Sequence, residues 1–210
     1  YFYTITALPL ATAVTLNYTS SVFIALFSTV MSRRQPAWQL IFAVMLGFAG
    51  VVALLNPTFH SDQLGQGLVG LASGVLAAVA MINVRSLGRL GEPEWRVVFY
   101  FSLVSTVAAG GWMLLHHFSP LRWESVLLML AMGTAATLAQ LALTRAYGQG
   151  RTLVVASLAY STVAFASLAG VVLWGDWLSP LSWLGIVAIV LSGVISTQSQ
   201  SLAASRANAR

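Results

Sequence analysis

Seven long apolar runs divide the chain, and proline or charged residues fill nearly every gap between them. A helix that crosses a membrane needs about 20 consecutive, mostly apolar residues, so each run predicts one spanning helix. The predicted helices cover residues 10–31, 38–55, 66–84, 97–115, 125–147, 152–174 and 182–198. A short apolar stub, residues 1–8, precedes them, and a small polar tail follows them. The pattern therefore predicts an all-α, polytopic membrane protein with seven full spans and an N-terminal stub.

The chain has ten arginines and no lysine, and the arginines fall almost entirely on one side of the predicted bundle. When the gaps are assigned alternately to two sides, only Arg122 lies on the second side. The other nine are Arg33, Arg34, Arg85, Arg89, Arg96, Arg145, Arg151, Arg206 and Arg210. Short loops rich in arginine stay in the cytoplasm. We therefore expect the loop at residues 33–34 and the C-terminal tail, residues 200–210, to be cytoplasmic.

The composition agrees with a membrane protein, because 58% of the residues are hydrophobic and only 7% are charged. A soluble domain carries roughly 25% charged residues. The net charge of +5 does not indicate a nucleic-acid partner, since the arginines lie between apolar runs and form no patch. The chain has no cysteine, and all five acidic residues lie outside the predicted spans or at their edges. The sequence therefore predicts no metal site, no cofactor and no catalytic cluster.

Two polar octets inside apolar runs indicate an internal repeat. The octet at residues 16–23 (LNYTSSVF) resembles the octet at 158–165 (LAYSTVAF). Tyr18 and Tyr160 occupy the same position in the two octets. The two copies run in opposite directions through the membrane under the arginine-based topology, which makes the repeat inverted. Such repeats are typical of transporters, although a chance match between apolar segments is the alternative. The expected domains are residues 1–57, the remainder of the first repeat, and 65–199, the second; further helices of the first repeat are expected before Tyr1.

The sequence resembles the EamA-like family of the drug/metabolite transporter superfamily, as about the last seven of its ten helices. The residues that carry the resemblance are 7–13, 18–20, 47–52, 139–140, 145–147, 160, 175–176, 178–180, 185 and 193. Membership implies a permease of the bacterial inner membrane that moves a small metabolite by alternating access. The resemblance does not imply a particular substrate.

Polar side chains inside the predicted spans are the candidate substrate contacts, because an unpaired polar group in hydrocarbon is costly. Asn17 and Tyr160 lie roughly 10 Å and 12 Å into their helices from opposite sides, at about 1.5 Å per residue. They therefore bracket the membrane midplane, where transporter sites tend to lie. The full candidate set is Asn17, Tyr18, Thr19, Asn83, Gln140, Tyr160 and Ser161. The alternatives are that the hydroxyls bond their own helices, that Asn83 is simply hydrated, and that the glycines near residues 47, 70 and 193 serve packing.

The function predicted from these features is a permease for a small amino-acid-like or other polar or amphipathic solute, with export as the favoured direction. The rival interpretations are a non-transporting membrane scaffold or an inactive transporter fragment. A scaffold has no need for two polar octets at matching depth, and a membrane enzyme needs a catalytic cluster that the spans lack. The expected partners are the solute and the lipid bilayer, and a homodimer stays an open alternative.

Overall fold

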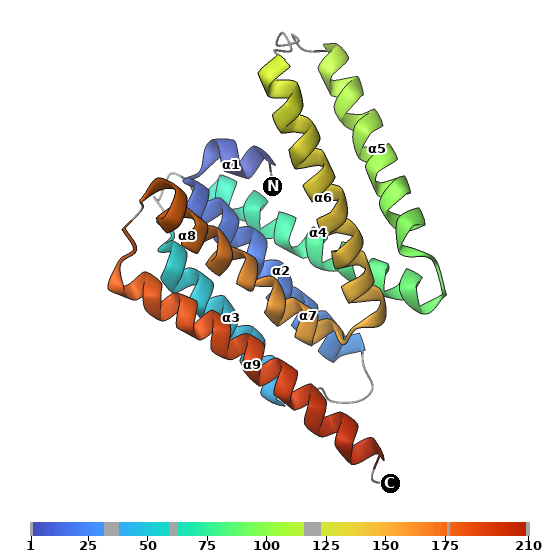
Figure 1. Cartoon of the computed structure of the whole chain (residues 1–210), viewed down its shortest axis with the longest axis vertical. Coiled ribbons are helices and arrows are strands. Elements are labelled where there is room, and N and C mark those ends of the chain that lie inside the picture. The colour runs from blue at the N-terminus through green and yellow to red at the C-terminus, as the bar shows by residue number, and fades with distance from the viewer. Residues whose placement is uncertain (1, 32–37, 59–62, 116–122, 176, 209–210) are drawn as a thin grey trace. The chain divides into compact units, whose positions relative to one another are not determined.

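The computed structural model describes residues 2–31, 38–58, 63–115, 123–175 and 177–208, and within them the regular structure is helical (Figure 1). The following charged residues that the sequence analysis used lie outside the described residues: Arg33, Arg34, Arg122, Asp176 and Arg210. The helices are α1 Phe2–Ala7, α2 Leu10–Met31, α3 Trp38–Leu55, α4 Leu64–Arg89, α5 Glu94–Leu115, α6 Trp123–Gln149, α7 Thr152–Ala159, α8 Ser161–Trp174 and α9 Pro180–Asn208.

Among the described residues, seven spans are long and apolar enough to cross a membrane, in agreement with the seven predicted spans. The predicted ends were less accurate. Helix α4 continues past the expected end at residue 84 to Arg89, because arginine is a good helix former whose long side chain reaches water from inside a helix. Helix α9 continues into the expected polar tail as far as Asn208. The sixth span is divided at Tyr160 into α7 and α8.

The chain forms two compact units, residues 1–82 with 151–210, and residues 83–150. In the first unit, helices α3 and α9 run side by side and form its main packing contact (Figure 1). Three hydrogen bonds join the two helices and show that they are antiparallel, because the partners on α3 come in the reverse order of those on α9. They pair Ser182 with Leu54, Ser192 with Ala43 and Ser199 with Gln39.

The α3–α9 contact is close because glycine faces glycine. A Cβ added at Gly50 would lie 2.7 Å from the carbonyl oxygen of Gly185, and one added at Gly185 would lie 2.6 Å from the carbonyl oxygen of Gly50. Small residues are the usual means by which membrane helices approach one another. The same holds at Gly70, where an added Cβ would lie 2.6 Å from Leu16 of α2. These glycines serve packing, as the sequence predicted.

A hydrogen bond across this contact yields a first prediction. The Ser192 hydroxyl donates to the carbonyl oxygen of Ala43 at 2.7 Å, and Ser192 is fully buried. We expect Ser192→Ala to lower the free energy of unfolding in detergent by about 0.6 kcal/mol, the average for hydrogen bonds between membrane helices. The control is Thr197→Ala on the same helix, whose exposed hydroxyl bonds only its own helix. An equal loss in both variants would contradict the assignment.

In the second unit, α5 and α6 form an antiparallel hairpin, since Gln149 at the end of α6 bonds Glu94 at the start of α5. Most residues of α5 and α6 are exposed in the structure. The exposed side chains are mostly apolar, among them Leu103, Val107 and Leu130. Such a surface is suited to hydrocarbon rather than to water.

Candidate functional site

Two tyrosines from the two polar octets meet inside the first unit. Tyr18 lies on α2 and is half-buried, whereas Tyr160 lies between α7 and α8 and is 0% exposed. Their ring centroids are 5.9 Å apart with the ring planes at 44°. Phe48 of α3 adds a third ring, 6.5 Å from Tyr160. These separations lie in the range of favourable aromatic pairs, so Tyr18, Phe48 and Tyr160 form one aromatic cluster.

Gly47 makes room for the cluster on α3. A Cβ added at this position would overlap the ring of Tyr160 and would lie 2.7 Å from the Ser192 hydroxyl. The position therefore accepts only glycine while Tyr160 keeps its place. Tyr160 also terminates α7, and the amide of Val163 donates to its carbonyl at 3.0 Å, a three-residue bond in place of the four-residue α-helical one. A local tightening of the span thus holds the Tyr160 ring toward α2 and α3.

The next residue in each octet makes the same local bond. The Thr19 hydroxyl donates to the carbonyl oxygen of Leu16, and the Ser161 hydroxyl donates to that of Leu158 at 2.6 Å. Each pair occupies the same place in its octet. Because each hydroxyl hydrogen is used within its own helix, Thr19 and Ser161 retain only acceptor lone pairs for a bound solute.

Ser161 lines an apolar groove rather than the aromatic cluster. The groove lies between α7–α8 and α9 and has a volume of ≈ 330 Å³. Leu158, Ser161 and Phe165 of the second octet line it. On α2 the corresponding residues Leu16 and Thr19 are covered, because Gly70 and Gly74 of α4 pack on them.

The other predicted contacts are distributed over both units. Asn17 lies beside Tyr18 on α2 and is half-buried. Asn83 is exposed and Gln140 is half-buried, and both belong to the unit of residues 83–150. Their contribution to a site around the aromatic cluster stays a prediction.

The sequence interpretation missed Phe48 and the pairing of Ser157 with Ser196. The Ser157 hydroxyl donates to the Ser196 hydroxyl at 2.7 Å, and the Ser196 hydroxyl donates to the carbonyl of Gly193 at 2.9 Å. This bonded pair joins α7 to α9 one turn from Tyr160. Nothing in the local sequence distinguishes these serines from ones that bond only their own helix, so only the packing of α7 on α9 identifies them.

No family model matches the chain. The chain is 32% identical over 196 residues to the pseudopaline exporter of Pseudomonas aeruginosa, and the match covers 91% of this chain and 67% of the exporter. It is 24% identical over 200 residues to an uncharacterized transporter of Helicobacter pylori, with 93% of this chain and 67% of that protein covered. It is 26% identical over 195 residues to the riboflavin transporter of Vibrio cholerae, covering 90% of this chain and 63% of that transporter.

A crystal structure with 22% sequence identity has the same fold, with a TM-score of 0.82 over 94% of this chain and 70% of that chain. The chain spans about two thirds of the length of the Pseudomonas aeruginosa and Helicobacter pylori relatives. All three relatives carry names of membrane transporters rather than enzymes.

Proposed function

The chain belongs to the family of membrane transporters that includes the pseudopaline exporter, and from that premise we propose that it is an EamA-like permease that exports a small metabolite by alternating access. The solute class is polar or amphipathic, and the membrane is the inner membrane with the C-terminus in the cytoplasm. The arginine asymmetry supports this orientation. The relatives' names support a metabolite as cargo, since one is named for pseudopaline and another for riboflavin.

The contact between Tyr18 and Tyr160 carries the proposal. Residues related by an inverted repeat lie on opposite sides of a two-fold axis in the membrane plane, and residues close to that axis touch each other. The two rings, 5.9 Å apart, meet this condition. The antiparallel α3–α9 pair supports the same axis, since α3 and α9 occupy equivalent places in the two copies. Transporter sites tend to lie at the interface of such repeats.

We propose that the solute binds beside this contact, with the polar groups of the octets as its partners. Asn17 offers an amide with two donors and two acceptor lone pairs, and Tyr18 offers a hydroxyl at the edge of the buried cluster. Thr19 and Ser161 use their hydroxyl hydrogens on Leu16 and Leu158. Thr19 is packed against Gly74 and Ser161 lines the apolar groove, so their acceptor oxygens reach the solute only when the helices rearrange. Tyr160 closes the site from the α7–α8 side, and Asn83 and Gln140 of the other unit are further proposed contacts of the solute.

A rocking motion of one repeat against the other would exchange the two faces of this site. Asn17 and Tyr18 are half-buried, whereas Tyr160 is fully buried. In this proposal, that difference belongs to one of the two conformations between which the repeats alternate. In the opposite arrangement the second octet opens and the first closes. A scaffold protein would have no use for such an exchange, and this distinguishes the two functions experimentally.

The test is a transport screen with a matched pair of variants. Bacteria that produce the protein are exposed to toxic amino-acid and nucleoside analogues and to riboflavin analogues, and intracellular pools are measured against an empty-vector strain. We expect raised tolerance and a lowered pool for at least one compound, because an exporter removes it from the cytoplasm. Asn17→Leu should abolish the effect, while Leu26→Ala, an exposed α2 position, should retain it. Unchanged pools for every compound would contradict the permease.

A further inference from the structure

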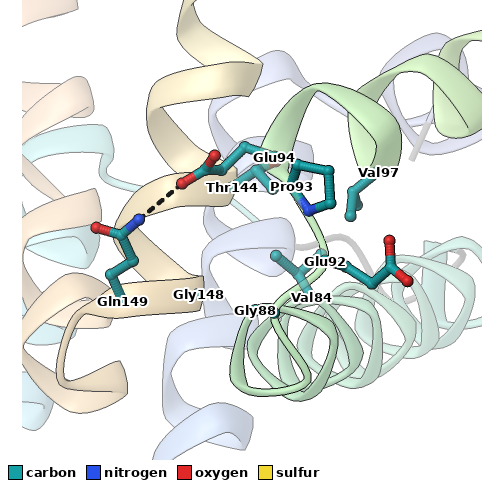
Figure 2. Close-up of a pocket in the computed structure, with 10 residues that line it drawn as sticks. Val84, Gly88, Glu92, Pro93, Glu94, Val97, Thr144, Gly148 and Gln149 are labelled. Atoms are coloured by element: carbon teal, nitrogen blue, oxygen red, sulfur yellow. Dashed lines mark hydrogen bonds between the residues drawn. The ribbon is translucent and has the colours of Figure 1, made fainter.

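A small polar cavity lies within the second unit, and all of its lining residues belong to that unit. It is enclosed by the end of α4, the turn that follows, the start of α5 and the end of α6, with a volume of ≈ 180 Å³. One water molecule needs only about 10–15 Å³ of such volume. Figure 2 shows Glu94, Thr144 and Gln149 around this cavity. Its full lining is Val84, Gly88, Gly91, Glu92, Pro93, Glu94, Val97, Thr144, Gly148 and Gln149.

Close backbone contacts fix part of the cavity wall. A Cβ added at Gly88 of α4 would lie 2.5 Å from the Cα of Gly148 of α6. The turn between α4 and α5 has Gly91 at φ 83°, a left-handed conformation that favours glycine. The amide of Glu92 then bonds back to the carbonyl of Leu87 at 3.1 Å. The cavity is therefore a built feature of the fold.

The charged residues that line the cavity are both acidic. Glu92 forms an ion pair with Arg96 at 2.7 Å, whereas Glu94 has no ion-pair partner among the described residues. Glu94 accepts a hydrogen bond from the Gln149 amide at 2.8 Å (Figure 2). Of the arginines that the structure describes in residues 83–150, none lines the cavity. A carboxylate without an ion-pair partner is suited to a cationic donor.

Thr144 provides an independent sign of a ligand. It is 5% exposed and lines the cavity, and its hydroxyl has no hydrogen-bond partner among the residues described in the structure. The other two threonines of α6, Thr134 and Thr137, donate to carbonyls of their own helix. The Thr144 oxygen is not among the fully enclosed, unbonded side-chain oxygens of the described residues, so it is open to the cavity and available to a group that enters beside Glu94.

We propose that this cavity binds the primary ammonium group of a small organic amine. An ammonium has three donors and no acceptor, and the cavity offers the Glu94 carboxylate, the Thr144 hydroxyl oxygen and the Gln149 amide oxygen as acceptors. The amide nitrogen of Gln149 is already used on Glu94, which leaves its oxygen for the ligand. The site lies at the ends of α4 and α6 that are predicted to face the cytoplasm, where cytoplasmic amines reach it. The proposal stands on the second unit alone and does not depend on transport.

The test measures equilibrium binding of radiolabelled propylamine to the purified protein, with 1-propanol and propionate as neutral and anionic competitors. We expect saturable binding that neither competitor displaces. Glu94→Gln keeps an acceptor for Gln149 but removes the charge, and it should weaken binding at least about tenfold, as for other hydrogen bonds to charged groups. Thr144→Val should weaken it about threefold. The matched control Thr137→Val, on the same helix outside the cavity, should leave the affinity unchanged.

Absence of saturable propylamine binding would overturn the proposal, as would equal displacement by 1-propanol or an unchanged affinity in both cavity variants. Melting temperatures of the variants guard against misfolding, and Thr144→Val, which is close to threonine in volume, carries the test if Glu94→Gln does not fold. A second assay with membrane vesicles separates two sources of the amine. Accumulation of the labelled amine identifies it as transported solute, and binding without accumulation identifies a regulatory ligand; either result retains the site.

Discussion

Tyr160→Ala is expected to abolish transport and to destabilise the protein by about 3–5 kcal/mol, the usual effect of removing a large buried aromatic side chain. Tyr160 is fully buried, contacts the rings of Tyr18 and Phe48, and lies at the division between α7 and α8. Removing its ring leaves a void against Gly47. The two repeats would then lose their central contact.

Melting temperature in detergent and solute efflux from cells measure the two parts of this prediction. Tyr160→Phe separates them, because the ring stays and only the hydroxyl is removed; it should retain most of the stability. Phe165→Ala is the matched control, since it lies in the same octet but is 71% exposed. Full activity of Tyr160→Ala, or an equal loss in Phe165→Ala, would show that the aromatic cluster has no special role.

Gly50→Leu is expected to have the second largest effect, on folding rather than on a solute contact. Even the first carbon of the new side chain would lie 2.7 Å from the Gly185 carbonyl oxygen and 2.9 Å from Ile189. A backbone oxygen cannot rotate away as a side chain does, so α3 and α9 have to separate. Overpacking of this kind typically costs about 1–3 kcal/mol, and occasionally more.

The measurement is thermal unfolding of the purified protein, with Gly50→Ala as a milder step in the same direction. Gly110→Ala on α5 is the control, because nothing lies within 4 Å of an added Cβ there. Alanine favours a helix over glycine by about 0.8–1 kcal/mol, so the control should be neutral or stabilised. A Gly50→Ala variant as stable as Gly110→Ala would contradict the tight glycine contact.

Much of the fold was predictable because spanning helices have a strong local signal. Hydrocarbon requires long apolar runs, and the runs at residues 38–55 and 97–115 end where α3 and α5 end. A helix end that lies in water does not need apolar residues, so the apolar run does not mark where the helix stops. Arg89 therefore continues α4 beyond the apolar run, and the alanine-rich tail continues α9. The division at Tyr160 depends on packing against Gly47, which no local pattern records.

The candidate site was predictable in part. The matching positions of Tyr18 and Tyr160 in their octets indicated related places, and the structure brings their rings into contact. The same pattern did not distinguish Ser161, which faces an apolar groove, from a residue of the aromatic cluster. Phe48 and the cavity beside Thr144 were missed for another reason. The aromatic cluster depends on the Tyr160 ring packing on Gly47, and the cavity depends on the close approach of the Gly88 and Gly148 backbones. A sequence records a glycine without recording its neighbour.

The central claim is that Asn17 and Tyr18 line a solute path that opens alternately to the two sides of the membrane. The chain has no cysteine, so a single Asn17→Cys variant can be labelled specifically with a membrane-impermeant thiol reagent, in right-side-out and inside-out vesicles. The reference is Leu26→Cys, at a 53% exposed α2 position that is predicted to face lipid. We predict that Asn17→Cys reacts faster than Leu26→Cys from at least one side, and that the solute identified in the screen changes the rate. Equal, slow labelling of both cysteines from both sides, with and without solute, would contradict the claim.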